Sequence, residues 1–276
     1  MPELPEVETI RRQLAPLVEG RTITDAGGHP SAKFSSAVEA AGRTIESVGR
    51  RGKYLMLDLD DGRNLVIHLG MTGRLQLTDP QGAPGPYVRA WWDLGHERLE
   101  LDDVRRFGRV AVIHPDDPSS LPTLAALGPE PFDPAFTGEH LWRALRASRA
   151  RVKTQLLSQR PVAGVGNIYA DEALWRAGIH PGTRVVSRAA AQALRDEITG
   201  VLSAAIDRGG TTLRDYRTVD GRPGTNQLHL ECYGRAGEPC VRCGETLVRL
   251  VLDGRGTTMC RTCQGVRRRV DRSRPH

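Results

Sequence analysis

The sequence is poor in lysine and contains no long apolar run. Only Lys33, Lys53 and Lys153 contribute lysines to its 39 Lys and Arg residues. No stretch approaches the roughly 18 consecutive apolar residues of a membrane-spanning helix, so we expect no membrane partner. The opening residues, MPELPEVETIRR, lack the apolar segment of a secretory signal peptide. Together these absences predict a cytoplasmic protein.

The overall composition is that of a folded globular protein. The chain has 276 residues, of which 39% are apolar and 26% charged, and these fractions exclude wholesale disorder. Its length allows one large domain or two smaller ones, each with a core. The net charge of +6 is compatible with nucleic-acid binding, but many unrelated enzymes are equally basic.

The hydrophobic pattern changes along the chain and divides it into domains. Residues 5–18 predict an amphipathic helix, and the short alternating runs from 21 to 113 predict strands. A Pro-rich stretch at 114–134 breaks both patterns, and residues 138–208 then have helical spacing. We therefore predict an N-terminal β-rich domain (1–115), a linker (116–134), a helical domain (135–227), a cysteine module (228–266) and a basic tail (267–276).

Four of the five cysteines have the spacing of a zinc site. They are Cys240, Cys243, Cys260 and Cys263, two C-x2-C pairs separated by sixteen residues. The alternative is two disulfides, but nothing in the sequence indicates an oxidising compartment. A module this small has little apolar core, so metal binding would supply much of its folding free energy. Cys232 is left over and is interpreted as a small buried apolar residue.

Arginines surround this module, and two interpretations of them remain open. Arg242, Arg249, Arg255 and Arg261 lie in or beside it, and three more follow at 267–269. They either offset the negative charge of four thiolates on zinc or bind phosphate groups.

The N-terminus combines Pro2 with Glu3 and Glu6. Removal of Met1 would leave proline as a terminal secondary amine, and terminal amines are less basic than lysine. Such an amine is a nucleophile for a carbonyl-like carbon, and a neighbouring carboxylate can move protons. The alternative is that PELPE only begins a helix, because proline and acidic residues favour the first helical turn.

Eight segments of the chain resemble the formamidopyrimidine-DNA glycosylases, bacterial enzymes that share a superfamily with endonuclease VIII. The segments occur in the family's order and span nearly the whole chain. The start PELPEVE favours the formamidopyrimidine branch over endonuclease VIII. The segments are MPELPEVETIRR (1–12), RRGKYLMLDL (50–59), HLGMTGRL (68–75), DDVRRFGR (102–109), AGVGNIYADEALWRAGIHP (163–181), GGTTLRDY (209–216), YGRAGEPCVRC (233–243) and GRGTTMCRTCQ (254–264).

The resemblance implies an α+β fold with two domains. The first would be an N-terminal helix with a β-sandwich, and the second a helix–two-turn–helix domain with a zinc-finger β-hairpin. It implies a DNA glycosylase with AP lyase activity for base excision repair, excising 8-oxoguanine and formamidopyrimidines before β,δ-elimination. It also implies one structural zinc ion, a partner that is double-stranded DNA with oxidised bases or abasic sites, a monomer, and a place at the bacterial nucleoid.

The resemblance further assigns catalytic roles to five residues. Pro2 would attack C1′ of the damaged nucleotide and form a Schiff base. Glu3 would act as general acid and base, and Glu6 would orient or shuttle protons. Lys53 would contact the phosphate beside the lesion and assist β-elimination. Arg255 would bind phosphate and take part in δ-elimination.

Other residues match DNA contacts of the family. Met71, Arg105 and Phe107 would fill the void left by the flipped nucleotide, with Arg105 reading the orphaned base. Glu172 would orient the catalytic end, and residues 211–224 would close over the flipped base. The remaining candidate DNA-binding residues are His68, Arg106, Arg149, Lys153, Asn167, Tyr169 and Arg214.

The GVGN segment at 164–167 is interpreted as a turn between two helices. Asn167 then stands at the start of the second helix, where backbone N–H groups and the helix dipole attract phosphate. We therefore expect this helix start to contact the DNA backbone.

The sequence departs from the family at three places. No histidine of the family pattern precedes Trp91-Trp92, Val104 stands where DPRRFG has proline, and residues 222–227 lack the usual aromatic pair. These departures affect contacts to DNA or the base, so the lesion spectrum is less certain than the reaction. The alternatives are an endonuclease VIII-like enzyme for oxidised pyrimidines and a non-catalytic, lesion-binding zinc protein.

Overall fold

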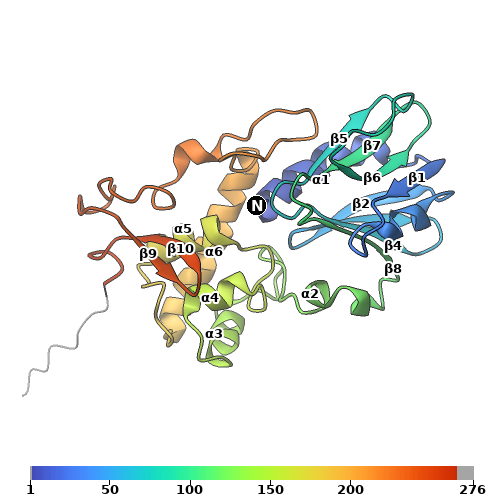
Figure 1. The fold of residues 1–276 in the computed structure, drawn as a ribbon. Coiled ribbons are helices and arrows are strands. Elements are labelled where there is room, and N and C mark those ends of the chain that lie inside the picture. Colours follow the sequence, from blue (N-terminus) through green and yellow to red (C-terminus); the bar gives the residue numbers. More distant parts are fainter. Residues whose placement is uncertain (1, 266–276) are drawn as a thin grey trace, which may run out of the picture.

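A computed structural model describes residues 2–265, so the predicted basic tail lies outside the described residues. The chain forms two lobes, a β-sandwich and a helical lobe with a small β-hairpin attached (Figure 1). The elements in order are α1 (Leu4–Val18), β1 (Asp25–Gly28), η1 (Ser35–Ala40), β2 (Ile45–Arg51), β3 (Tyr54–Leu59), β4 (Asn64–His68), β5 (Arg74–Thr78), β6 (Val88–Asp93), β7 (Arg98–Asp102), β8 (Arg109–Ile113), η2 (Pro118–Ser120), α2 (Pro122–Ala125), α3 (Gly138–Arg146), α4 (Val152–Leu157), α5 (Asn167–Arg176), α6 (Arg188–Asp207), η3 (Asn226–His229), β9 (Val248–Leu252) and β10 (Arg255–Met259).

The first lobe consists of two antiparallel four-stranded sheets. Their strand orders are β1-β6-β7-β5 and β2-β3-β4-β8. Leucines that alternate along β3 and β4 point into the core between the sheets, as period-2 patterning requires. The α+β class and the sandwich expected from the sequence are confirmed.

Helix α1 connects the cores of the two lobes. Leu4 packs in the helical core, whereas Val7, Ile10 and Leu14 pack in the sandwich core. All four side chains are buried, and each such burial stabilises the fold by about 1.5–3 kcal/mol. Because α1 belongs to both cores, the N-terminal end of the chain lies at the junction of the lobes (Figure 1).

The predicted linker is partly structured. Within it, η2 and α2 bring Leu121 and Leu124 onto Tyr54 and Val66 of the adjacent sheet. A separate core in the helical lobe is formed by α3 to α6, and α6 contacts both α1 and α5. In the part of the chain described here, no helix has the length and apolarity needed to cross a membrane.

The cysteine module is a β-hairpin that packs against α5. Strands β9 and β10 pair antiparallel around the turn Asp253-Gly254, whose two residues have φ of 47° and 76°. Such left-handed values are typical of tight hairpin turns. Trp175 of α5 shares a small buried cluster with Cys232, Cys240, Leu247 and Cys260, which fixes the hairpin to the helical lobe.

Candidate active site at the junction of the lobes

Glu3 is fixed at the N-terminus of α5. Its carboxylate accepts hydrogen bonds from the backbone N–H groups of Gly166 at 2.8 Å and Ile168 at 2.9 Å. The helix dipole favours an anion at this position, and the side chain is only 2% exposed. The sequence suggests that these N–H groups attract DNA phosphate, but the structure shows them bonded to Glu3 instead.

Two glycines of the GVGN segment make this docking possible. A Cβ on Gly166 would lie 2.3 Å from the Glu3 carboxyl carbon. A Cβ on Gly164 would lie 2.4 Å from Leu4, and the backbone there has φ of +83°. The N–H of Leu4 also donates to the Gly164 carbonyl at 3.1 Å. The absence of a side chain at both glycines therefore leaves space for Glu3 and Leu4 between the lobes. The preceding residue, Pro2, is also buried.

Glu6 joins the N-terminus to the loop that follows α6. It accepts hydrogen bonds from Glu3 N at 2.7 Å, Tyr169 OH at 2.6 Å and Thr211 N at 2.7 Å. Burial, and next the charge of Glu3, raises the pKa of Glu6 to about 7. A carboxyl group with this pKa exchanges a proton near neutral pH, as expected of a group that shuttles protons.

Lys53 lies in the two-residue turn between β2 and β3, as its position before a strand suggests. Gly52, with φ of +57°, occupies the first position of this turn. Lys53 is 3% exposed, and burial lowers its pKa, while the charges of Glu3 and Glu6 raise it. The charges of Glu3 and Glu6 thus partly offset the cost of burying this ammonium group.

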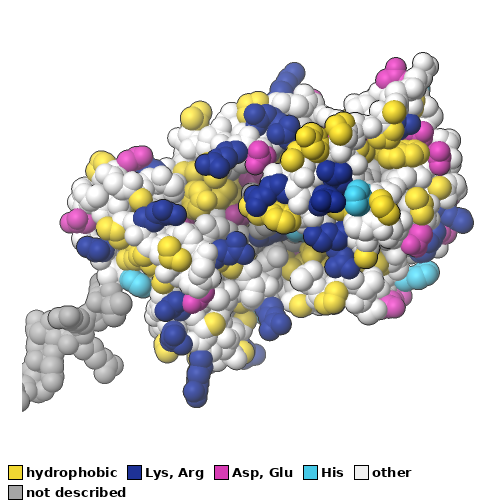
Figure 2. All heavy atoms as spheres, in the orientation of Figure 1, with side chains coloured by type: hydrophobic (Ala, Val, Ile, Leu, Met, Phe, Trp, Pro, Cys, Tyr) yellow, Lys and Arg dark blue, Asp and Glu magenta, His cyan; other side chains and the backbone are white. Residues whose placement is uncertain are grey.

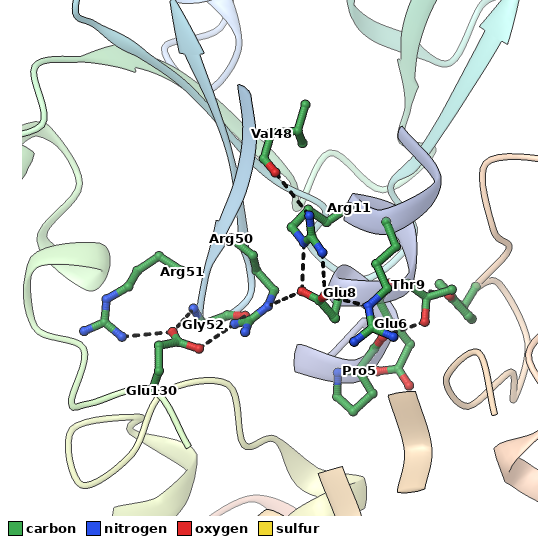
Figure 3. A network of polar contacts seen from close by, with 12 residues as sticks. Pro5, Glu6, Glu8, Thr9, Arg11, Val48, Arg50, Arg51, Gly52 and Glu130 are labelled. Atoms are coloured by element: carbon green, nitrogen blue, oxygen red, sulfur yellow. Dashed lines mark hydrogen bonds and ion pairs between the residues drawn. The ribbon is translucent and has the colours of Figure 1, made fainter. Parts of the chain in front are cut away.

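A network of ion pairs connects this turn to the linker and to α1 (Figure 3). Glu130 of the linker accepts from Gly52 N at 2.6 Å, Arg50 at 2.7 Å and Arg51 at 3.0 Å. Arg50 also reaches Glu8 of α1 at 3.1 Å. The three segments therefore fix the backbone next to Lys53, and no sequence pattern singles out Glu130 or Arg50.

A cavity of about 220 Å³ opens beside these groups. Its lining includes Glu3, Lys53, Met71, Asn167 and Arg255, five residues that the sequence analysis singled out. The structure therefore brings together predicted site residues from α1, the β2–β3 turn, the β4–β5 loop, α5 and β10. Leu213 and Tyr233 also line it; the sequence motifs point only to the segments that contain them.

Met71, Arg105 and Phe107 lie on two adjacent loops of the sandwich. The Arg105 guanidinium lies 4.6 Å from the centre of the Phe107 ring, and Phe107 is 46% exposed. Buried Asp103 joins the loops, because it accepts from Thr72 Oγ1 at 2.5 Å and from Gly108 N at 2.7 Å. Exposed apolar side chains next to arginines suit insertion into a duplex.

Arg106 and His68 flank these loops. Arg106 is exposed with an unusual φ of 55°, and its carbonyl accepts from Lys33 at 2.8 Å. His68 is half-buried beside Tyr54; burial, and next the charge of Lys53, lowers its pKa to about 4. His68 is therefore neutral at physiological pH and can act as a hydrogen-bond donor without carrying a charge.

Tyr169 and Lys153 do not have the exposed positions expected of DNA contacts. Tyr169 is 1% exposed, and its hydroxyl is bonded to Glu6. Lys153 is also 1% exposed and pairs with Asp171 at 2.6 Å, while it donates to Thr257 Oγ1 at 2.8 Å. Both predictions are corrected: these side chains connect buried parts of the protein, where DNA has no access.

Glu172 also has a different position from the one expected. Instead of reaching the catalytic end, it accepts from the backbone N–H groups of Glu231, Cys232 and Tyr233 at 3.1, 2.8 and 2.7 Å. It therefore fixes the segment that leads into the cysteine module. Arg149 is exposed but lines a second cavity, separate from the one beside Lys53.

Asn167 and Arg255 meet at the edge of the zinc hairpin. The Asn167 amide donates to the Gly256 carbonyl at 3.0 Å. Arg255 is exposed and begins β10 directly after the turn, where Asp253 accepts from Arg151 at 2.5 Å and from Thr154. Arg214 is exposed in the loop after α6. Basic side chains also gather along the junction between the lobes on the face shown in Figure 2.

The four predicted cysteines form one metal site. The Sγ atoms of Cys240, Cys243, Cys260 and Cys263 all lie within 4.8 Å of one another. Four thiolates at this spacing suit tetrahedral zinc, whose role in a closed site is structural. Cys232 is outside the set: it is fully buried, and its thiol donates to the Thr258 carbonyl at 3.1 Å.

Comparison with known families covers nearly the whole chain. The N-terminal domain model of formamidopyrimidine-DNA glycosylase matches residues 1–110, its H2TH domain model matches 127–217, and a zinc finger found in FPG and IleRS matches 237–266. Relatives named formamidopyrimidine-DNA glycosylase include one from Deinococcus radiodurans, 44% identical over 99% of this chain and 100% of that protein. Another, from Thermus thermophilus, is 45% identical over 96% of this chain and 99% of that protein.

Solved structures agree with the sequence matches. The MutM (FPG) protein from Thermus thermophilus has a TM-score of 0.90 and 45% identity, with 96% of this chain and 99% of that chain covered. The Lactococcus lactis formamidopyrimidine DNA glycosylase bound non-covalently to DNA with an AP site has a TM-score of 0.86 and 34% identity. In that comparison, 96% of this chain and 100% of the other are covered.

Proposed function

Because the chain belongs to the formamidopyrimidine-DNA glycosylase family, we propose that its N-terminal proline carries out the chemistry. The protein is a DNA glycosylase of base excision repair that removes oxidised purines. Its partner is double-stranded DNA with lesions or abasic sites, and one structural zinc ion completes the fold.

Pro2 is the nucleophile of the proposed reaction. After removal of Met1, its secondary amine attacks C1′ of the damaged nucleotide, the glycosidic bond breaks, and the base leaves with the bonding electrons. The product is an iminium ion between the proline nitrogen and the opened sugar, which withdraws electrons from the neighbouring carbons. A terminal amine with a pKa near 8 is partly unprotonated at neutral pH, so it needs little activation.

Glu3 and Glu6 move protons in this proposal. Glu3, fixed at the α5 N-terminus, takes the proton that the proline nitrogen loses and delivers it to the sugar oxygen as the ring opens; the carboxylate later accepts a proton from C2′. Glu6, with a pKa of about 7 and hydrogen-bonded to Glu3 N, exchanges protons next to this site. Loss of the C2′ proton expels the 3′ phosphate, and loss of the C4′ proton in a second elimination then expels the 5′ phosphate.

Lys53 and Arg255 bind the phosphates of the damaged strand. Both line the cavity that contains Glu3, and a phosphate between them would replace the carboxylates that now neutralise Lys53. We assign to Arg255 the stabilisation of the second leaving phosphate. Met71, Arg105 and Phe107 fill the void in the duplex, with Arg105 facing the orphaned base, while Arg106, His68, Asn167 and Arg214 contact the backbone.

The observation that carries this proposal is the position of Glu3. Its carboxylate is held by α5 of one lobe, directly after Pro2 and in the same cavity as Lys53 of the other lobe. An acidic group, a lysine and an arginine thus converge at a terminal amine, although they are distant in sequence. The relatives named above carry the formamidopyrimidine name, and no observation favours the two alternative functions.

Borohydride trapping tests the assignment directly. Reduction during turnover of an 8-oxoguanine duplex should join the protein to DNA through Pro2, because borohydride reduces the iminium ion. Protein whose terminus is extended by two residues is the matched control, since its proline nitrogen is an amide. An adduct on the extended protein, or fully active protein that retains Met1, would contradict the role of Pro2.

We also propose that the enzyme works at the nucleoid of a bacterial cell, since its relatives are bacterial repair enzymes. A fluorescent protein fused after the C-terminus, which leaves Pro2 free, should colocalise with stained chromosomal DNA. Uniform cytoplasmic fluorescence after oxidative damage would contradict this placement.

A further inference from the structure

A second, larger cavity lies in the helical lobe, far from Glu3 and Lys53. It has a volume of about 750 Å³ and is lined by Trp142 and Arg146 of α3, Arg149, and Arg184, Val185 and Arg188 around the start of α6. Cavities of this size accommodate a ligand or several side chains. None of its lining residues borders the cavity beside Lys53.

Helix α6 begins at this cavity and ends close to Glu6. Its first residue, Arg188, lines this cavity, and the segment after its last turn donates from Thr211 N to Glu6. The helix has 20 residues, which corresponds to about 28 Å from end to end. The start of α6, which lines this cavity, is therefore distant from Glu6.

The charge of the cavity is strongly positive and poorly neutralised. Within the described residues, Arg146, Arg149 and Arg184 have no acidic partner within ion-pair distance, and Arg188 reaches only Glu139 at 3.6 Å. The first turn of α6 contains no acidic residue and begins with Arg188, although the helix dipole favours anions there. Like charges gathered at a helix N-terminus are unfavourable unless an anion binds them.

The cavity also has an apolar and aromatic wall in a defined geometry. The guanidinium groups of Arg146 and Arg188 lie 4.7 and 4.2 Å from the centre of the Trp142 ring. Val185 is 82% exposed at the rim, which is unusual for a valine. Stacking on Trp142 orients both guanidinium groups before a ligand binds, and this lowers the entropic cost of binding.

We propose that this surface, the Trp142 pocket, binds an acidic peptide segment of a partner protein that carries at least one apolar side chain. Arginine forks bind carboxylates bidentately, and the apolar side chain would cover Val185 and the edge of Trp142. Single-stranded nucleic acid fits less well, because two guanidinium groups already lie over the ring on which a base would stack. The Arg-rich end of this chain has the same charge as the pocket and is not its complement.

The first experiment measures binding of a fluorescein-labelled peptide, Asp-Asp-Asp-Phe, to the full-length zinc-loaded protein by fluorescence anisotropy. The double variant Arg146→Glu/Arg188→Glu should weaken binding by at least about tenfold. The matched control is Arg143→Glu, on the same helix but outside the pocket lining. Replacing Phe by Gly in the peptide should also weaken binding, because the apolar contact is lost.

Competition with lesion DNA separates this site from the DNA-binding junction. A short duplex carrying 8-oxoguanine should not displace the peptide, and both variants should cleave that duplex like the unmodified protein, which also shows that they are folded. Displacement by the duplex, or peptide affinity unchanged in the double variant, would overturn the proposal. So would absence of peptide binding together with weaker binding of a long duplex by the double variant, which would assign the pocket to DNA.

Discussion

At the scale of single residues, the proposed chemistry depends on a few buried carboxyl groups. Glu3 and Glu6 lie within one turn of each other, but α5 stabilises the charge on the first through two backbone donors. Glu6 is desolvated, and its pKa is raised to about 7. Two neighbouring carboxyl groups thus have different environments, as catalysis by proton transfer requires.

The titration of Glu6 predicts a pH dependence of stability. A carboxyl group with a raised pKa stabilises the fold fully below its unfolded pKa of 4.5, and this contribution is lost as pH rises through about 7. The stability of the unmodified protein relative to Glu6→Gln should therefore fall by up to about 3 kcal/mol between pH 4.5 and 8. Urea unfolding of both proteins across this range measures the difference; parallel pH profiles would contradict a raised pKa.

Arg255 provides a second prediction at this scale. If it binds a phosphate, Arg255→Ala should lower affinity for any duplex and reduce the slope of log K against log salt by about one unit. Arg249→Ala, an exposed arginine of the paired strand, is the control. An unchanged salt slope in Arg255→Ala would indicate that this arginine only offsets the charge of the thiolates.

At the scale of elements, the structure shows how distant segments are fixed around the site. The buried pair Lys153–Asp171 connects α4, α5 and β10, because Asp171 also accepts from Thr258 N at 2.9 Å. Glu130 likewise connects the β2–β3 turn to the linker, because it accepts hydrogen bonds from Gly52, Arg50 and Arg51 (Figure 3). Each arrangement thus fixes the backbone next to a residue with a proposed role. The first lies beside Arg255, and the second lies beside Lys53.

Glu130 is therefore predicted to be a positioning residue for Lys53. In Glu130→Gln a charged acceptor becomes an amide, so the turn that contains Lys53 is held less firmly. Strand cleavage should therefore slow by roughly tenfold, and substrate affinity should change less. Glu139→Gln, a surface acid of α3, is the control. Single-turnover rates for base release and for strand cleavage measure the effect.

A purely structural role for Glu130 would give another result. In that case all rates would fall together with the melting temperature. The prediction requires a selective loss of strand cleavage at unchanged thermal stability.

At the scale of the whole molecule, α1 joins the two lobes, whereas the zinc hairpin packs on the helical lobe. Helix α1 contributes to both cores, whereas the hairpin has only a small cluster around Trp175. The β-sandwich should therefore not depend on zinc, but the position of Arg255 should.

Zinc removal tests whether the position of Arg255 depends on the metal while the β-sandwich does not. Freshly purified protein should contain about one zinc per chain, and a chelator should abolish lesion binding by disordering the hairpin. The β-sheet signal in circular dichroism should persist, and fluorescence should change through Trp175, so that Trp175→Phe is the control for this signal. Folded, active protein with little zinc would contradict a structural metal.

Much of the fold follows from local patterns. The helix at 5–18, the strand region, the four-cysteine site and the turn before Lys53 correspond to observed elements, because periodicity and spacing are local properties. The directions of side chains are less predictable. Tyr169 and Lys153 look like exposed DNA contacts in sequence but are buried, because their partners Glu6 and Asp171 are identified only by tertiary packing.

The sequence by itself determined the order of elements and the ligands of the metal, since each depends on residue type and short spacing. The proposed reactive groups came from the resemblance to a family, because short spacing alone left their role open. Tertiary structure alone decided that Glu3 occupies the α5 N-terminus, that Glu130 holds the Lys53 turn, and that four arginines meet around Trp142. These are contacts between segments distant along the chain. Burial and charge at such contacts arise only when these distant segments pack together, so no local pattern specifies them.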